Sequence, residues 1–366
     1  MDFETARALV RDHGSPLLCL SRTRLLESLN LLRSSLPGVE LYYAVKSNGH
    51  EGILSLFAGQ GIGFDLASKG EFEMVQACGV TGARCIHTHP IKCDGEIAAA
   101  LDSGITTFVA DNPDELRKLV PYRDRLSVLI RLSISNPHCL VNLSHKFGVP
   151  PAEAFPLICT AVDLGLVVEG LAFHVGSQNE SVAKYLEALD YCRDICRMAA
   201  LEGIALRTID IGGGFPIDYL CPAVPLVQFC QPINEYLERS FANYRILAEP
   251  GRFLCGPSGT LVTTVVGRSL RNGVQWYYLD EGVYGCLSGK VYDHADYPML
   301  VDREGERRTS TLAGPTCDSI DVLYENIPLP LLEIGDIVLF GSMGAYTNAS
   351  ASDFNGLPRA RIIMID

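Results

Sequence analysis

The chain lacks the features that mark secreted, membrane-spanning and nucleic-acid-binding proteins. Its 13 cysteines are scattered without a Cys-x-x-Cys pair, and no apolar run is long enough to cross a bilayer. It also lacks a signal-peptide core near its first residue, so we expect a cytoplasmic protein with reduced thiols. Basic residues are outnumbered by acidic ones, since the chain has 30 Lys and Arg and 43 Asp and Glu. The net charge of −13 disfavours nucleic acid and anionic membrane as partners.

Short apolar runs that each end at a polar residue are the most informative pattern that is present. Eight such runs alternate with amphipathic stretches and turn signals, as buried strands do between helices. This alternation predicts a (β/α)8 barrel, whose chemistry collects where the strands end. The residues that end the runs are Lys46, Asp65, His87 to His89, Asp111, Arg131, His174, Asp210 and Glu249.

The sequence also predicts helices between these strands. Asn112 is a capping residue followed by Pro113 and two acids, which is typical of a helix start. Residues 181–201 carry apolar side chains at helical spacing. Together with the eight strands, these signals favour an α/β barrel from residue 21 to residue 255.

The pattern of residues along the chain changes after Gly256. The segments 260–266, 275–279, 336–340 and 361–364 are rich in β-branched and aromatic residues and have few helix signals. They indicate a second, mostly antiparallel β domain. We assign residues 1–20 and 256–366 to it, with 16–20 expected to form an edge strand.

Three strand ends suggest a site for a phosphorylated ring cofactor. Lys46 follows a buried strand, where partial desolvation lets an amine form a Schiff base, although a lone lysine there is more often a surface residue. The glycines at 212–214 would let backbone N–H groups approach a phosphate, or would form only a tight turn. Glu249 and Arg252 would hold a pyridine nitrogen and a phosphate, or would form a salt bridge at the strand end.

Other candidates are ambiguous when taken alone. His174 would stack on a cofactor or serve as a structural histidine. Cys317 lies beside two acids in the segment GPTCDSID, although a free cysteine is usually a small buried hydrophobe. His87 and His89 resemble a metal pair, but no Cys, Asp or Glu set accompanies them, so we expect no metal.

Together, the motifs resemble the alanine-racemase-like, fold-type III enzymes that use pyridoxal 5′-phosphate (PLP), and more narrowly the ornithine/lysine decarboxylase branch. The resemblance covers nearly the whole chain and follows the order of the family's motifs. The motifs are YAVKSN at 43–48, FDLASKGE at 64–71, KFG at 146–148, HVGSQ at 174–178, DIGGGFP at 210–216, AEPGR at 248–252, GPTCDSID at 314–321 and GAYT at 344–347.

The resemblance implies a role for each matching residue. Lys46 would bind PLP covalently, Glu249 would face the pyridine nitrogen, and His174 would stack on the ring. Asp65 and Arg131 would flank the Lys46 side of the cofactor. The remaining cofactor-binding residues, mostly at the phosphate, would be Ser177, Gly213, Gly214, Gly251, Arg252 and Tyr346.

The resemblance also implies a homodimer with shared active sites. Cys317 and Asp318 would reach into the barrel of the partner subunit, and Cys317 would protonate the carbanion left after CO2 departs. Lys46, Cys317 and His174 would therefore be the catalytic residues.

The expected substrate is a basic amino acid, most favourably L-ornithine or L-lysine, which would yield a diamine for polyamine biosynthesis. Tyr292 and Asp293 resemble the family segment that binds the distal ammonium, with Asp318 as a second carboxylate. A related diamino acid or siderophore intermediate stays open as a substrate, and so does an inactive regulatory homologue. A racemase of this fold would need a tyrosine where the sequence has Cys317.

Overall fold

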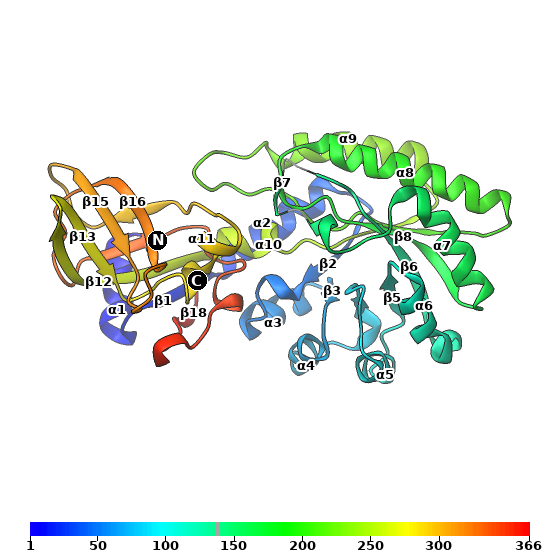
Figure 1. Ribbon diagram of the computed structural model, residues 1–366, viewed down its shortest axis with the longest axis horizontal. Coiled ribbons are helices and arrows are strands. Elements are labelled where there is room, and N and C mark those ends of the chain that lie inside the picture. Colours follow the sequence, from blue (N-terminus) through cyan, green and yellow to red (C-terminus); the bar gives the residue numbers. More distant parts are fainter. Residues whose placement is uncertain (137–138, 142) are drawn as a thin grey trace. The chain divides into compact units, whose positions relative to one another are not determined.

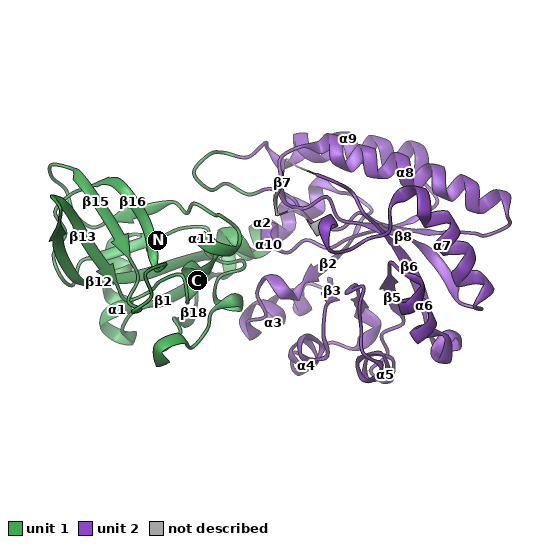
Figure 2. Cartoon of the chain, viewed as in Figure 1, with its two compact units in different colours: residues 1–27, 217–222, 255–366 green, residues 28–216, 223–254 purple. Residues whose placement is uncertain are grey.

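The chain divides into two compact units in the computed structural model, which describes residues 1–136, 139–141 and 143–366 (Figure 2). One unit, here called the barrel unit, comprises residues 28–216 and 223–254. The other, the sheet unit, comprises residues 1–27, 217–222 and 255–366.

The barrel unit contains a closed barrel of eight parallel strands in the order β10-β11-β2-β3-β4-β5-β6-β8 (Figure 1). Each strand contains one of the polar residues named from the sequence or ends within two residues of it, and the predicted (β/α)8 barrel is confirmed. The strands are β2 Glu40–Ala44, β3 Gly63–Leu66, β4 Cys85–His87, β5 Thr107–Ala110, β6 Ser127–Leu132, β8 Val167–Phe173, β10 Thr208–Asp210 and β11 Arg245–Ala248.

Helices alternate with these strands around the barrel (Figure 1). The predicted start at Asn112 is confirmed, since its side chain accepts the N–H of Glu115 at 2.9 Å and Pro113 begins the helix. The helices are α2 Arg22–Ser35, which begins in the sheet unit, α3 Glu51–Gly59, α4 Lys69–Ala77, α5 Asp94–Asp102, α6 Pro113–Leu119, α7 Pro151–Asp163, α8 Val182–Leu201, α9 Leu226–Phe241 and α10 Arg252–Cys255. A short antiparallel pair, β7 Cys139–Val141 with β9 Ser177–Asn179, completes the unit.

Apolar side chains from six of the eight barrel strands form one buried cluster. Its members are Tyr42, Ile86, Val109, Leu129, Ala172 and Leu247. A cluster of this kind closes the interior of a barrel with a packed core, so that polar chemistry is confined to the strand ends.

The sheet unit is built on eight strands that are mostly antiparallel. Six of them run in the order β14-β17-β12-β13-β15-β16, and β1 joins the sheet by pairing with β12 and β18. The described pairs are antiparallel except β1 with β18 and β13 with β15. The elements are α1 Phe3–His13, β1 Leu17–Ser21, β12 Gly259–Arg271, β13 Val274–Leu279, α11 Gly289–Tyr292, β14 Met299–Val301, β15 Arg308–Ala313, β16 Val322–Leu329, β17 Ile337–Phe340 and β18 Arg361–Ile365.

Strand β1 corrects one expectation, because residues 16–20 do not form an edge strand. β1 has neighbours on both sides, β12 and β18, and every one of its residues is buried. A strand made of the residues LLCLS has no polar face to present to water, so an interior place suits it better than an edge. The preceding helix α1 was not predicted, although Asp2 caps it by accepting the N–H of Thr5 at 2.8 Å.

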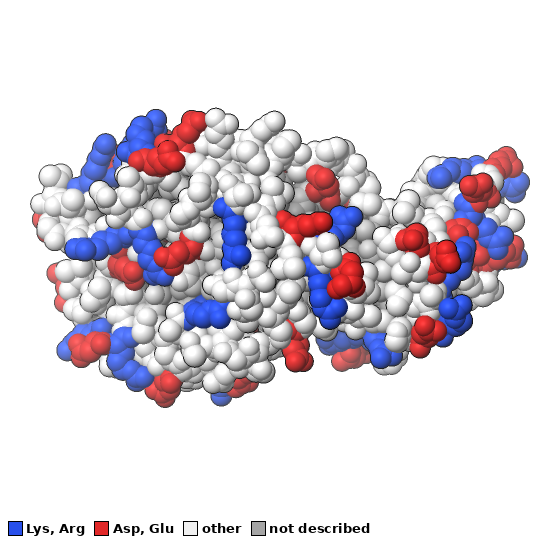
Figure 3. Space-filling view, turned by 180° about the vertical axis from the view of Figure 1, so that it is seen from behind, with Lys and Arg blue, Asp and Glu red and all other residues white. Residues whose placement is uncertain are grey.

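The distribution of surface charge and the state of the cysteines can be compared with the composition of the chain. On the face drawn in Figure 3, acidic and basic side chains are intermingled, so the negative net charge does not gather in one patch there. All 13 cysteines are free thiols. Within the described ranges, no helix has both the length and the apolar character needed to cross a membrane.

Candidate active site

Lys46 and Asp65 form the first pair of the site, at the ends of neighbouring strands. Lys46 lies in the short 3-10 turn Val45–Ser47 that follows β2, and Asp65 lies in β3. The Nζ of Lys46 is 2.8 Å from Oδ2 of Asp65. The Asp65 side chain is only 1% exposed, whereas that of Lys46 is 38% exposed. The carboxylate is therefore fixed inside the barrel, while the amine remains within reach of a bound molecule.

His174 follows β8 and has a neutral ring at physiological pH. Its Nδ1 accepts the N–H of Gly176 at 3.0 Å, which leaves the ring proton on Nε2. The pKa of His174 lies well below its usual range, first because the ring is buried and then because Arg131 and Lys46 are cationic. A neutral imidazole can lie against an aromatic cofactor without adding charge to the site.

Two buried carboxyls, Asp210 and Glu249, lie at the ends of β10 and β11. Burial raises the pKa of Asp210 to about 6, and burial together with Asp210 and Asp65 raises the pKa of Glu249 well above its usual range. One oxygen of Asp210 accepts the N–H of Gly212 at 2.9 Å, and a hydrogen bond between the two carboxyls lowers the pKa of Asp210 and raises that of Glu249. The pair therefore suits a bound group that carries a proton or a positive charge.

This pair predicts how the cofactor-free protein responds to pH. The folded protein holds the Asp210 proton more tightly than the unfolded chain, so Asp210 contributes stability below pH 3.8 and loses it as the pH rises through about 6. Asp210→Asn keeps the shape without ionising. Between about pH 4 and about pH 7, its free energy of unfolding should therefore fall less than that of the wild type, by about 2 kcal/mol. Urea unfolding of both proteins at the two pH values measures the difference, and equal falls would contradict it.

The turn after β10 has the backbone geometry of a phosphate cradle. Gly212 and Gly214 have φ angles of +67° and +109°, which favour glycine. A Cβ on Gly213 would lie 2.5 Å from the carbonyl oxygen of Glu249, and one on Gly214 would lie 2.3 Å from that of Gly176. Only glycine fits these positions without a backbone shift, and the absent side chains leave N–H groups open to an anion.

Arg252 supplies a cation to the same unit. It begins α10, is buried, and its Nε donates to Oγ of Ser177 at 3.0 Å. The preceding Gly251 packs tightly, because a Cβ there would lie 3.0 Å from the Cβ of Ser47. A buried guanidinium beside a hydroxyl matches the donor set that binds phosphate.

Arg131, the other predicted cation, lies near the end of β6. Its guanidinium carbon lies 5.6 Å from the ring centroid of Phe147, a cation–π contact within the KFG motif. Arg131 also contributes to the low pKa of His174. The arginine and the imidazole are therefore electrostatic neighbours.

The remaining predicted residues belong to the sheet unit. The O–H of Tyr284 donates to Asp318 and, with the backbone N–H of Ile320, lowers the pKa of that carboxyl. Cys317 is exposed, and its backbone N–H donates to Oδ1 of Asn355 at 3.0 Å. Tyr292 closes α11, and Asp293 and Tyr346 lie in the same unit.

Two polar residues of these networks were missed from the sequence. Tyr284 holds Asp318 and stacks on Phe354 with ring centroids 4.1 Å apart, but no local pattern marks it. Thr88 donates its O–H to Asp65, and it lies between the two histidines that were weighed as a metal pair. The His87 ring is buried against Phe108, and burial lowers its pKa to about 4. No group of metal ligands occurs within the described part of the chain.

Comparison with known proteins decides the family. Residues 22–256 match the family description "Pyridoxal-dependent decarboxylase, pyridoxal binding domain". The chain belongs to this family. It is a PLP-dependent amino-acid decarboxylase, as the motifs suggested, and the glycine cradle, the buried Arg252 and the Asp210–Glu249 pair fit that cofactor.

The chain is similar to known decarboxylases over nearly its full length. It is 41% identical to the lysine/ornithine decarboxylase of Selenomonas ruminantium, an alignment that covers 98% of this chain and 92% of that protein. The structure of the Vibrio vulnificus lysine/ornithine decarboxylase with cadaverine superposes with a TM-score of 0.95 at 44% identity, over 100% of this chain and 98% of that one. A structure of SrLDC with PLP and cadaverine gives a TM-score of 0.95 at 39% identity, over 100% and 94% of the two chains.

Proposed function

We propose that this enzyme decarboxylates L-ornithine or L-lysine to the diamine and CO2. The observation that carries the proposal is the similarity, over nearly the full length, to lysine/ornithine decarboxylases of two bacteria. The positions of Asp293 and Asp318 in the family's motifs support it further, because a carboxylate pair suits a substrate with a distal ammonium.

Within the barrel, each polar strand end has a proposed task. Lys46 would bind PLP covalently, and Asp65 would hold the lysine amine in place. His174 packs against the ring as a neutral imidazole, and Arg131 flanks the Lys46 side. Bound PLP supplies an electron sink for the bond that breaks. Glu249, supported by Asp210, keeps a proton at the pyridine nitrogen, which deepens that sink.

The phosphate of the cofactor is assigned to the glycine turn and its neighbours. The N–H groups of Gly213 and Gly214, the guanidinium of Arg252 and the hydroxyl of Ser177 are proposed to bind it. Gly251 and the Tyr346 hydroxyl complete this set, which anchors the end of the cofactor that takes no part in the bond changes.

Residues of the sheet unit are proposed to act in the active site of a partner subunit. Cys317 delivers a proton to the carbon that loses CO2. Asp293 and Asp318, with Tyr292 beside them, receive the distal ammonium of the substrate. The functional form is then a cytoplasmic homodimer with shared active sites.

Mixing two inactive variants tests the shared site. Lys46→Ala and Cys317→Ala each remove one half of every site, but a hybrid dimer has one site with both residues intact. Random exchange makes about half of the dimers hybrids, so the mixture should regain about a quarter of wild-type activity. Activity is measured after subunit exchange has been shown by mass spectrometry. No recovery in exchanged dimers would mean that each chain builds its own site.

A decarboxylation screen tests the proposed substrate. The PLP-loaded enzyme is incubated with both enantiomers of ornithine, lysine, arginine and diaminopimelate, and CO2 and amines are quantified. Putrescine from L-ornithine or cadaverine from L-lysine is expected to dominate. A clear preference for another amino acid would overturn the proposed substrate and leave the assignment to the family intact.

A further inference from the structure

Thr88 links the segment after β4 to the Lys46–Asp65 pair. Its backbone N–H donates to the carbonyl of Leu66 at 3.2 Å, one residue beyond Asp65. Its hydroxyl donates to Oδ1 of Asp65, while Oδ2 of the same carboxylate is 2.8 Å from Nζ of Lys46. Each oxygen of Asp65 thus has its own donor. Because Thr88 and Asp65 are both buried, water does not replace the hydroxyl easily.

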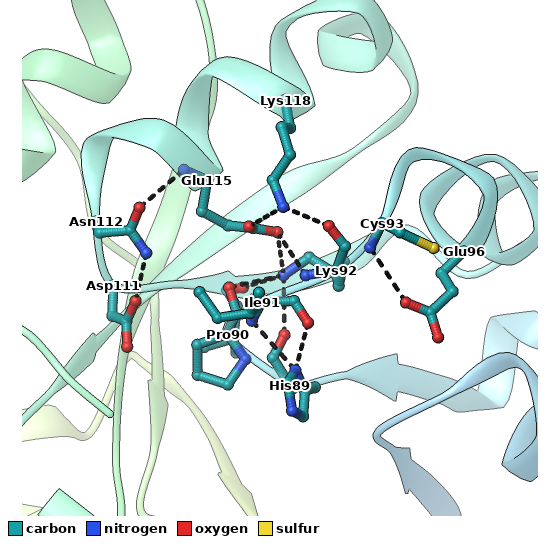
Figure 4. A network of polar contacts seen from close by, with 11 residues as sticks. His89, Pro90, Ile91, Lys92, Cys93, Glu96, Asp111, Asn112, Glu115 and Lys118 are labelled. Atoms are coloured by element: carbon teal, nitrogen blue, oxygen red, sulfur yellow. Dashed lines mark hydrogen bonds and ion pairs between the residues drawn. The ribbon is translucent and has the colours of Figure 1, made fainter. Parts of the chain in front are cut away.

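A buried ion pair fixes the segment that carries Thr88. The Lys92 side chain is fully buried, and its Nζ lies 3.1 Å from Oε1 of Glu115 in α6 (Figure 4). The same Nζ donates to the carbonyls of Val109 at 2.7 Å and His89 at 2.9 Å. The Lys92 side chain therefore connects the segment that follows β4 to β5, through Val109, and to α6, through Glu115.

Glu115 receives more than this one cation. The backbone N–H of Lys92 donates to its Oε1 at 3.1 Å, and the Nζ of Lys118 approaches its Oε2 at 2.5 Å (Figure 4). The carboxylate is 1% exposed. A buried charge pair is retained at low cost only where further hydrogen bonds satisfy both groups, as they do here. The geometry of residues 88–92 is therefore tightly determined.

We propose that Thr88 is a positioning residue that turns Asp65 toward Lys46, and that the Lys92–Glu115 pair holds Thr88 in place. The proposal rests on the proposed roles of Lys46 and Asp65. By occupying Oδ1, the hydroxyl leaves Oδ2 as the oxygen that orients the lysine amine. Without it, Oδ1 is left without its donor in a dry site, and the carboxylate can rotate and draw the amine away from the cofactor.

The test follows the bond between Lys46 Nζ and the aldehyde carbon of PLP, which forms with loss of water. Cofactor-free protein is mixed with PLP, and the rate constant of capture is read from the absorbance and from the adduct fixed by borohydride. Thr88→Val should slow capture about tenfold, a typical effect of losing a hydrogen bond to a charged group. Thr88→Ser keeps the hydroxyl and should capture within about twofold of the wild-type rate.

Thr208→Val is the matched control. Thr208 is a buried threonine of the same barrel whose hydroxyl donates to a carboxylate, Oε1 of Glu169, at 3.0 Å. The Thr208→Val variant should leave the capture rate unchanged even if it lowers the melting temperature. Lys92→Met should also slow capture. In the double variant Thr88→Val/Lys92→Met, the fold-decrease in the capture rate should be smaller than the product of the fold-decreases of the two single variants.

Two outcomes would overturn the inference about Thr88. The first is wild-type capture by Thr88→Val, and the second is equal slowing by Thr88→Val and Thr208→Val. Capture by a lysine other than Lys46 in the wild type would instead refute the proposed function, so the two failures can be told apart.

Discussion

Lys46→Ala is expected to lower kcat by a factor of about 1,000 to 10,000, in the range that a positioned proton-transfer group contributes. The amine lies just after β2, and it is held by a buried carboxylate 2.8 Å away. An alanine keeps the strand but offers no group to bind PLP covalently or to exchange protons with the substrate. Turnover of L-ornithine and L-lysine by the purified variant, with PLP added, measures the loss.

The control for this variant is another lysine of the barrel unit. Lys184 lies on α8 and pairs with Glu187 at 2.8 Å, so Lys184→Ala should keep wild-type turnover. If Lys46→Ala also kept turnover within about tenfold of wild type, covalent catalysis by this residue would be excluded.

Asp293→Asn is expected to lower kcat/KM for L-ornithine and L-lysine by about 30- to 5,000-fold, while PLP stays bound. The physical reason is that, on the proposed assignment, the distal ammonium would lose one of its two carboxylates. Removing one partner of such a charge pair typically costs about 2–5 kcal/mol, and Asn keeps the shape without the charge. Steady-state kinetics on a basic substrate and on diaminopimelate measure the change.

A nearby acid provides the control for Asp293. Asp296 is 55% exposed and pairs with Lys290 at the surface, so Asp296→Asn should change kcat/KM by less than about twofold. Unchanged turnover of the basic substrates by Asp293→Asn would end the assignment of the ammonium to this residue. Improved turnover of diaminopimelate would point to a pocket for a distal carboxylate.

The barrel and its polar strand ends were predictable because they depend on local pattern. A run such as residues 41–45 must be buried, and parallel strands that close a barrel bring their last residues to one end. This is why Lys46 and Asp65, 19 positions apart in the chain, could be expected to lie together. The helix start at Asn112 was predictable for the same reason, since capping is a local interaction.

Features that depend on distant pairing were not predictable. Strand β1 is interior because it pairs with residues near 260 and near 361–365, and no local signal reveals such partners. Thr88 holds Asp65 across neighbouring strands, while its own sequence context suggested a metal pair. The Lys92–Glu115 pair was likewise hidden, because a lysine in a loop after a strand is normally solvated.

The central claim is that Lys46, at the end of β2, carries the cofactor. Borohydride reduction of the PLP-loaded wild-type enzyme, followed by proteolysis and peptide mass spectrometry, tests it most directly. We expect a single phosphopyridoxyl group on Lys46, in the peptide that contains YAVKSN. A phosphopyridoxyl group on any other lysine, or none after loading and reduction, would contradict the account.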